Sequence, residues 1–228
     1  MMIYDKKIGI YFSTKINDND FFSGFGTKKT KLKQIVGRDR RIFQLKQIHS
    51  DKIVCFNYLN KQEEGDGMYT NDKHVVITVQ TADCVPIIYA DKKKKIIGIS
   101  HQGWKGTQLR LTQKMIRQFL NLNSMIKDLR VAIGPSIGSC CYNIDEERLK
   151  IFKVEFASYP QSVFDIHLDK PFLNLSYLNY LQLIEMGLNK EQIDFFPFCT
   201  KCHEKHFYSF RRDGLPIKKE MTNFVVFS

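Results

Sequence analysis

The stretch QTADCVPIIYADKKKKIIGISHQGWKGT, residues 80–107, restricts the fold of this chain more than any other segment. Two short apolar runs, VPIIYA and IIGIS, flank the polar sequence DKKKK, which is typical of an exposed turn between two strands. The pattern predicts a β-hairpin. If its turn is centred between Lys92 and Lys93, Cys84 lies opposite His101 at the open end, close enough for both to bind one ion. This pairing depends on the register, and a slip of one residue would alter it.

A third metal ligand is available from a turn earlier in the chain. His49 lies in QLKQIHSDKIVCF, between two strand-like runs. His49, Cys84 and His101 give one thiolate and two imidazoles, which leaves a fourth position free for water, as in catalytic rather than structural zinc sites. Zinc in such a site activates water near neutral pH, and the same ligands also suit copper. Two alternatives stay open, a buried cysteine beside an unrelated histidine and a Cys/His nucleophile pair.

The rest of the chain predicts an α+β fold with mixed β-sheets flanked by helices. Helical periodicity or capping residues occur at residues 104–121, after Asp145 in EERLKIFKVEF, and from Ser176 to Leu188. Because strands often follow one another without an intervening helix, a doubly wound parallel sheet is disfavoured. The sequence has neither internal repeats nor a Pro/Gly/Ser-rich linker, which indicates a single domain over residues 1–228. Apolar and β-branched runs predict strands near residues 8–12, 42–48, 52–56, 75–80, 85–90, 95–100, 129–134, 194–198 and 206–210.

The chain is strongly basic, with a net charge of +11 from 35 Lys and Arg against 24 Asp and Glu. A nucleic-acid partner is one interpretation of this charge. The lysines, however, cluster in loops, at residues 28–33, 92–95 and 218–219, without interleaved aromatic residues. We therefore expect a lysine-rich surface and no nucleic-acid partner, with part of the charge favouring an anionic small substrate. A basic nucleic-acid-binding module is the non-enzymatic alternative.

The sequence also argues against a membrane or secreted location. Its longest apolar runs, such as VVITV at residues 75–79, are much shorter than the roughly 18 residues that a membrane span requires. The N-terminal sequence MMIYDKKIGIYFS lacks the apolar core of a secretory signal. We therefore expect a cytoplasmic protein without a membrane partner, in which the six cysteines are thiols or metal ligands rather than disulfides.

The motif CTKCH at residues 199–203 has several interpretations. The pattern C-x-x-C-H attaches c-type haem, but that attachment requires export to an oxidising compartment. Together with His206, the same stretch is C-x2-C-H-x2-H, a set of potential zinc ligands. We expect the metal site to be at Cys84 instead, and CTKCH to hold no metal. The adjacent Cys140 and Cys141 are expected to be structural.

Four motifs, in the order TADCVP, HQGWKG, AIGPSIGSCCYNI and FYSFRRDG, resemble the YfiH family over about Phe21 to Gly214. Members of this family have been described as laccase-domain or multicopper polyphenol oxidase-like proteins, peptidoglycan editing factors and purine nucleoside phosphorylases. The resemblance implies a single α+β domain similar to the catalytic domain of cytotoxic necrotizing factor. It also implies zinc bound by His49, Cys84 and His101, phosphorolysis of adenosine, inosine and methylthioadenosine, and hydrolytic deamination of adenosine.

These expected reactions assign roles to further residues. Asp83, next to Cys84, is a candidate either to relay a proton or to orient a metal ligand. Arg211 in SFRRDG is the candidate phosphate ligand, because a guanidinium can bind phosphate through two hydrogen bonds. Lys105 and Arg212 are weaker candidates for the same role.

Three departures from the family pattern leave the metal ligands intact but affect the expected substrate site. Lys105 replaces the arginine of H-A-G-W-R-G, Phe210 replaces the histidine of F-Y-S-H-R-R, and a G-R-M-like motif is missing near the C-terminus. They leave the substrate range and phosphate affinity open, and the oligomeric state is also unknown. Two enzymatic alternatives are hydrolysis of a wrong amino acid from a nucleotide-linked muramyl precursor and copper-dependent phenol oxidation. The second needs more copper ligands than one Cys/His2 set supplies.

Overall fold

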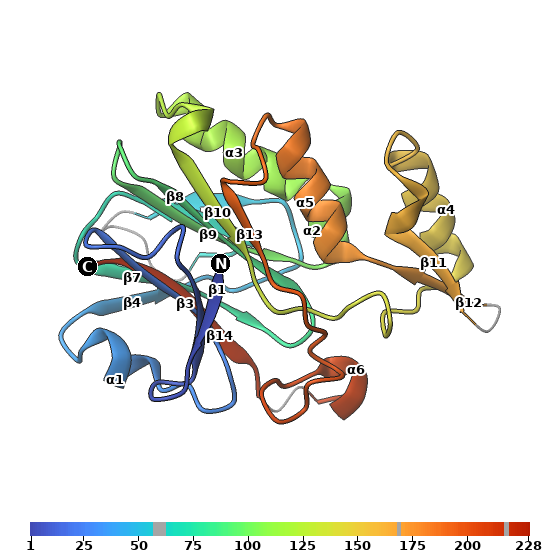
Figure 1. The fold of residues 1–228 in the computed structure, drawn as a ribbon, viewed down its shortest axis with the longest axis horizontal. Helices are drawn as coiled ribbons and strands as arrows, with labels where there is room; N and C mark the ends of the chain where they lie inside the picture. The colour runs from blue at the N-terminus through green and yellow to red at the C-terminus, as the bar shows by residue number, and fades with distance from the viewer. Residues whose placement is uncertain (57–62, 168–169, 217–218) are drawn as a thin grey trace.

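The strands of the computed structural model form two stacked sheets; helices lie over one of them, and α1 (Leu32–Val36) lies beside the other (Figure 1). The structure describes residues 1–56, 63–167, 170–216 and 219–228. One six-stranded sheet consists, in spatial order, of β1 (Met2–Asp5), β2 (Ile10–Ser13), β3 (Phe21–Gly26), β14 (Met221–Phe227), β7 (Val75–Thr81) and β4 (Arg41–Gln44). The other consists of β13 (Ile193–Phe195), β10 (Leu129–Ile133), β8 (Val85–Asp91), β9 (Ile96–Gln102), β6 (Gly67–Thr70) and β5 (Ile53–Cys55).

Both sheets mix parallel and antiparallel pairs. In the first sheet β4 runs parallel to β7, and in the second β13 runs parallel to β10 and β5 to β6. The other pairs of these two sheets are antiparallel. A separate antiparallel ribbon joins β11 (Phe164–His167) to β12 (Lys170–Leu173). The predicted α+β class with mixed sheets is therefore confirmed.

The longer helices pack on the outer face of the second sheet or stand at one end of the molecule. In Figure 1 α2, α3 and α5 lie together over that sheet, whereas α4 projects beside the β11–β12 ribbon. The helices are α1 (Leu32–Val36), α2 (Trp104–Gln108), α3 (Leu111–Asn121), α4 (Glu146–Glu155), α5 (Leu175–Glu185) and α6 (Phe210–Asp213), with 3-10 turns at Ile126–Asp128 and Gln161–Val163. No helix among the described residues combines the length and apolarity needed to cross a bilayer.

The central strand β8 explains why VPIIYA is apolar without interruption. Val85 and Ile87 belong to a core shared with the helices, whereas Ile88 and Ala90 belong to a core shared with the first sheet. All four side chains are fully buried. Because successive side chains of a strand point to opposite faces, a strand covered on both faces must be apolar at every position.

The predicted β8–β9 hairpin is present, but its predicted register was wrong. The structure pairs Pro86 with His101 and Asp91 with Ile96, so the turn is centred one residue later than expected. The Asp91 carboxylate accepts hydrogen bonds from the backbone N–H groups of Lys93 and Lys94, at 2.8 Å each, which fixes this longer turn. His101 therefore lies opposite Pro86 and not opposite Cys84 as predicted, and Cys84, two residues before Pro86, is its diagonal neighbour.

Several predicted elements differ from those observed. Residues 206–210 form no strand, because Ser209 instead caps α6 by accepting a hydrogen bond from the backbone N–H of Arg212 at 3.2 Å. The predicted helix over residues 104–121 is two helices, separated by Arg110 in the left-handed conformation with φ 60°. The third predicted helix begins at Leu175, with Asn174 rather than Ser176 as its cap. The predicted cap Asp145 is confirmed.

Candidate active site

The three predicted metal ligands meet at the open end of the β8–β9 hairpin. Cys84 directly precedes β8, His101 lies in β9, and His49 lies in the loop after β4. The Cys84 sulfur and one ring nitrogen of each histidine all lie within 4.8 Å of one another. The ring centroids of His49 and His101 are also 4.8 Å apart. The fold therefore brings together a thiol and two imidazoles that are up to 52 positions apart in the sequence.

Asp66, which the sequence analysis did not select, holds both histidines in place. Its fully buried carboxylate lies 2.8 Å from His101 Nδ1 and accepts a hydrogen bond from the backbone N–H of His49 at 3.1 Å. It also accepts hydrogen bonds from the backbone N–H and the hydroxyl of Ser50. Burial raises the pKa of Asp66, but the hydrogen bonds from His101 and Ser50 outweigh it and hold the pKa below its ordinary value. A carboxylate bound to the second nitrogen of a ligating histidine is the usual support of a metal site.

The absence of a side chain at Gly103 leaves the space in which the ligands converge. A Cβ atom at this position would lie 2.7 Å from His49 Nδ1 and 3.4 Å from the Cys84 sulfur. His49 itself has a positive φ of 56°, which turns the chain at the end of its loop. The position after HQ in HQGWKG therefore has to be glycine if His49 is to approach Cys84.

The charges of the cluster favour a cation. Burial raises the pKa of the Cys84 thiol, but the neighbouring His101 and His49 lower it to about 6. Burial lowers the pKa of His101, but Cys84 and Asp66 raise it to about 10. In the absence of metal the pair is thus a thiolate next to an imidazolium. Because a metal ion must displace that proton, binding at this set would release it. The donor set and its geometry fit a three-ligand zinc site.

A pocket of about 420 Å³ opens from these ligands. His49, Asp83 and Cys84 line one side of it. Its other walls are mainly apolar and aromatic, which suits a planar organic ligand. They are formed by Ile48, Ala82, Trp104, Ile137, Tyr142, Leu175 and Phe210.

Three cations complete the lining of this pocket. Lys105 and Arg211 were candidates from the sequence, whereas Arg148 was missed because a lone arginine in the first turn of a helix carries no recognisable motif. The Arg211 guanidinium donates to the backbone and side-chain oxygens of Asn143, at 3.0 and 2.8 Å, and lies 4.9 Å from the Tyr142 ring centroid. Together these cations make the pocket attractive to an anion.

Arg148 has an unused donor at this pocket. Its guanidinium lies 4.4 Å from the ring centroid of Trp104. Its Nε is buried and has no hydrogen-bond partner among the described residues. A buried donor without a partner is costly, and the other end of the same guanidinium pairs with Asp145, with Nη2 3.6 Å from its carboxylate. By contrast, Arg212 is bound to Asp213 and to backbone carbonyls, including that of Phe207 at 2.9 Å, and does not line the pocket.

Asp83 is held by three hydrogen bonds. Its carboxylate accepts from the hydroxyl of Thr200 at 2.6 Å, from the hydroxyl of Ser209 at 3.0 Å and from the backbone N–H of Arg211 at 2.7 Å. Its backbone has a φ of 94°, which a non-glycine residue rarely adopts. Through these hydrogen bonds Asp83 joins the residue before Cys84 to the loops that carry Thr200, Ser209 and Arg211.

The fold and the cluster can now be compared with known proteins. A family described as multi-copper polyphenol oxidoreductase laccase matches residues 15–225. The chain belongs to this family. A solved structure from Bacillus licheniformis, titled hypothetical protein YfiH, is 25% identical, covers 91% of this chain and 93% of its own, and has a TM-score of 0.82. YlmD from Geobacillus stearothermophilus has a TM-score of 0.85 at 22% identity, covers 98% of this chain and 97% of its own, and supports the fold alone. The predicted YfiH-like fold is thereby confirmed.

Curated relatives of the chain carry enzyme names. Purine nucleoside phosphorylase of Borreliella burgdorferi is 34% identical over 221 residues, covering 92% of this chain and 86% of the relative. Purine nucleoside phosphorylase LACC1 of Mus musculus is 31% identical over 183 residues, which are 77% of this chain but only 41% of that protein. Adenosine deaminase RL5, from an unknown prokaryotic organism, is 30% identical over 181 residues, covering 75% of this chain and 69% of the relative. These names agree with the prediction of an enzyme.

Proposed function

We propose that this chain is a zinc-dependent purine nucleoside phosphorylase for adenosine, inosine and methylthioadenosine, and that it also deaminates adenosine. The observation that carries the proposal is the position of the ligand set. His49, Cys84 and His101 converge at a pocket that also presents the cations Arg148 and Arg211. The names of the relatives support the same two reactions.

In this proposal His49, Cys84 and His101 hold the zinc ion. Asp66 orients the His101 ring through Nδ1, so its other nitrogen is left for the metal. Zinc bound there supplies a Lewis acid that activates water near neutral pH. The same set is compatible with copper, so the metal is part of the proposal.

The apolar walls of the pocket would receive the nucleoside. Ile137, Leu175 and Phe210 offer a non-polar surface for a planar purine. Trp104 and Tyr142 would not stack on the purine, because their rings already form cation–π contacts with the guanidinium groups of Arg148 and Arg211. These aromatic rings keep the cations at the edge of the pocket while excluding water from it.

Phosphorolysis moves the ribosyl group from the purine nitrogen to a phosphate oxygen. The bond from C1′ to the purine breaks, a bond from C1′ to the phosphate oxygen forms, and the released base takes up a proton. Arg148 and Arg211 would bind the phosphate and direct its oxygen toward C1′, which is catalysis largely by positioning and charge. Deamination instead adds water to C6 of adenine and releases ammonia, and it requires no phosphate.

The test is to assay protein of measured zinc content with adenosine, in the presence and absence of phosphate. We expect adenine and ribose 1-phosphate only when phosphate is present, and ammonia in both conditions, with inosine accumulating without phosphate and partly cleaved to hypoxanthine when phosphate is present. Cys84→Ala should lose the zinc ion of this site and both activities, whereas Cys55→Ser should keep them, because Cys55 lies in β5 and does not line the pocket. Zinc-loaded protein that forms neither set of products would contradict the proposal.

One observation favours a second candidate, a Cys/His hydrolase. The pKa of Cys84 is lowered to about 6 by its two histidines, against the effect of burial, as in an activated thiol nucleophile. The two functions differ in the state of the sulfur, since a metal occupies it and a nucleophile needs it free. If zinc protects Cys84 from alkylation and the zinc-loaded protein is the active form, the hydrolase is excluded.

The remaining alternatives are separated by their products. Release of free serine or glycine from a nucleotide-linked muramyl precursor would indicate peptidoglycan precursor editing. Oxidation of a phenol by the copper-loaded protein would indicate the activity after which the laccase family is named. Oligonucleotide binding that falls steeply with salt and survives His101→Ala would indicate a nucleic-acid-binding module.

A further inference from the structure

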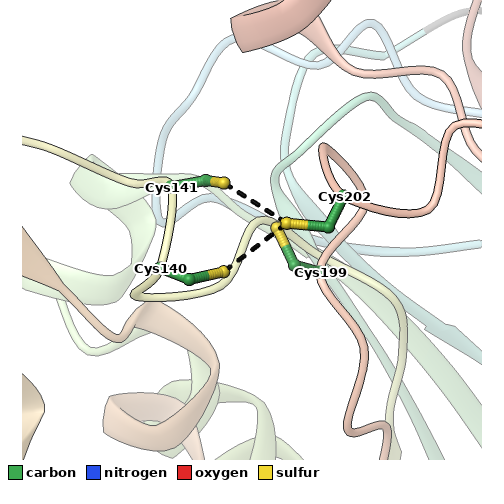
Figure 2. Close-up of side chains that lie close together, drawn as sticks. All are labelled: Cys140, Cys141, Cys199 and Cys202. Carbon is green, nitrogen blue, oxygen red and sulfur yellow. Dashed lines mark hydrogen bonds between the residues drawn. The ribbon is translucent and has the colours of Figure 1, made fainter.

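Four cysteines that the proposed function does not use lie close together (Figure 2). Cys140 and Cys141 occupy a turn after β10, and Cys199 and Cys202 lie in the loop after β13. Figure 2 shows the two pairs pointing toward one another from these separate loops. All four sulfur atoms lie within 4.8 Å of one another.

The spacing of the sulfur atoms fits a tetrahedral metal site. The Cys202 sulfur is 3.8 Å from that of Cys140 and 3.5 Å from that of Cys141. Four sulfur atoms around zinc, each at about 2.3 Å, stand about 3.8 Å apart. A disulfide would require about 2.05 Å, and all four cysteines are free thiols in the structure. Tetrathiolate coordination is a usual arrangement of structural zinc.

The backbone around the cluster is shaped for sulfur ligands. The stretch from Cys199 to Cys202 forms a tight turn, in which the backbone N–H of His203 donates to the Cys199 carbonyl at 3.1 Å. A Cβ atom at Gly138 would lie 3.3 Å from the Cys140 sulfur and 3.2 Å from the Cys199 Cβ atom, so a side chain there would crowd the cluster.

The two histidines of the C-x2-C-H-x2-H pattern, His203 and His206, have other hydrogen-bond partners. His203 Nδ1 lies 3.0 Å from the Cys199 carbonyl oxygen, and its ring packs 4.7 Å from that of Phe198. His206 Nδ1 is 2.7 Å from the hydroxyl of Tyr11. The potential metal ligands that lie close to the two cysteines of CTKCH are therefore Cys140 and Cys141 of GSCCYN rather than these two histidines.

We propose that Cys140, Cys141, Cys199 and Cys202 bind a structural Zn²⁺ through four thiolates, at a site separate from His49, Cys84 and His101. This inference replaces the expectation that CTKCH holds no metal, and it does not depend on the proposed enzymatic function.

The proposed zinc would connect two loops that shape the active site. The backbone N–H of Thr200 donates to the carbonyl of Ser136 at 3.0 Å, and the Thr200 hydroxyl donates to the Asp83 carboxylate. The backbone N–H of Ile137 donates to the Asp83 carbonyl at 2.9 Å, and the Ile137 side chain lines the pocket. A metal that joins these loops therefore fixes a wall of the pocket and the residue before Cys84.

The test combines metal analysis with thiol titration on the full chain, purified under reducing conditions without added metal. We expect about two zinc ions per chain, one for each of the two ligand sets. Cys202→Ser should lose one of them and Cys84→Ala the other, while Cys55→Ser keeps both. Cobalt-substituted protein gives a readout that does not depend on activity. The strong sulfur-to-cobalt charge-transfer absorption of a four-thiolate site should persist in Cys84→Ala, whereas in Cys202→Ser only the weaker absorption of the single Cys84 thiolate should remain.

If Cys202→Ser fails to fold, thiol titration of the unmodified chain still tests whether the four cysteines bind zinc. Titration with an organomercurial in the presence of a zinc indicator should release two zinc ions in total, one as Cys84 reacts and the other only as the four clustered thiols react. The proposal is overturned if Cys202→Ser retains the zinc content and cobalt spectrum of the unmodified chain. It is equally overturned if two of these four cysteines resist the titration and the protein mass is lower by two hydrogens, which would show a disulfide.

Discussion

The proposed catalytic metal site depends on the absence of a side chain at Gly103. We predict that Gly103→Ala lowers zinc affinity by about 10- to 100-fold, the range found when the support of a metal ligand is lost. The physical reason is that the new Cβ atom would lie 2.7 Å from His49 Nδ1 and force that ring away. Competition with a chromogenic chelator measures the affinity.

Gly106→Ala is the matched control for this change. Gly106 lies three residues further along, in α2, where its added Cβ would lie 3.2 Å from the Gln102 side-chain oxygen and 3.4 Å from the Ser50 carbonyl oxygen, without approaching a ring of the metal ligands. Alanine is also favoured over glycine in a helix. Equal zinc affinities in the two variants would show that His49 does not bind the metal.

Arg148 offers a second prediction at the same scale. Arg148→Gln should raise the KM for phosphate by roughly 10- to 150-fold, because it removes a charged hydrogen bond worth about 1.5–3 kcal/mol. Adenosine deamination requires no phosphate, so its rate should change much less. Steady-state kinetics with varied phosphate measure the first effect and ammonia release measures the second. Arg117→Gln, on the exposed face of α3, is the control. Equal losses in both reactions would indicate a structural role for Arg148.

Among the elements, α5 begins after Asn174, and its capping residue can be tested by mutation. The Asn174 side chain accepts a hydrogen bond from the backbone N–H of Tyr177 at 3.1 Å, whereas Ser176 lies inside the first turn. We predict that Asn174→Ala lowers the free energy of unfolding by about 1 kcal/mol, the usual contribution of a helix cap. Ser176→Ala should cost less than half of that, since alanine is the better helix former. Urea denaturation compares them, and the reverse order would place the cap at Ser176.

The hairpin shows how far a pattern can predict an element. Apolar runs on both sides of DKKKK were sufficient to predict β8 and β9, because strand propensity and turn polarity are local. The register was not predicted, because Asp91 fixes the turn through its own side chain. The predicted strand over residues 42–48 ends at Gln44 for a similar reason, since Asp66 binds the backbone N–H groups of Ile48 to Ser50.

At the scale of the molecule, the predicted single domain leads to a test of cooperativity. The C-terminal β14 lies between β3 and β7, and the core between the sheets includes residues from both. We predict that unfolding in urea gives coincident transitions by far-UV circular dichroism and by fluorescence of Trp104, the single tryptophan. Phe224→Ala in β14 should lower the free energy of unfolding by about 3–5 kcal/mol, because the ring is fully buried. Both transitions should move together to a lower urea concentration.

Val154→Ala is the control for this experiment, because that side chain is 78% exposed. If Phe224→Ala shifted the circular dichroism signal alone, the two sheets would unfold separately and the chain would contain two domains.

The sequence by itself determined the features that depend on neighbouring residues. These are the hairpin, the residues at its open end that are suited to bind a metal, the cap at Asp145 and the α+β class. The tertiary structure decided what joins distant segments. It placed Asp66 behind His101, Arg148 at the pocket and Cys140–Cys141 against CTKCH. Periodicity and capping report local backbone preference. Which charges and thiols meet depends on long-range strand pairing, which no short pattern encodes.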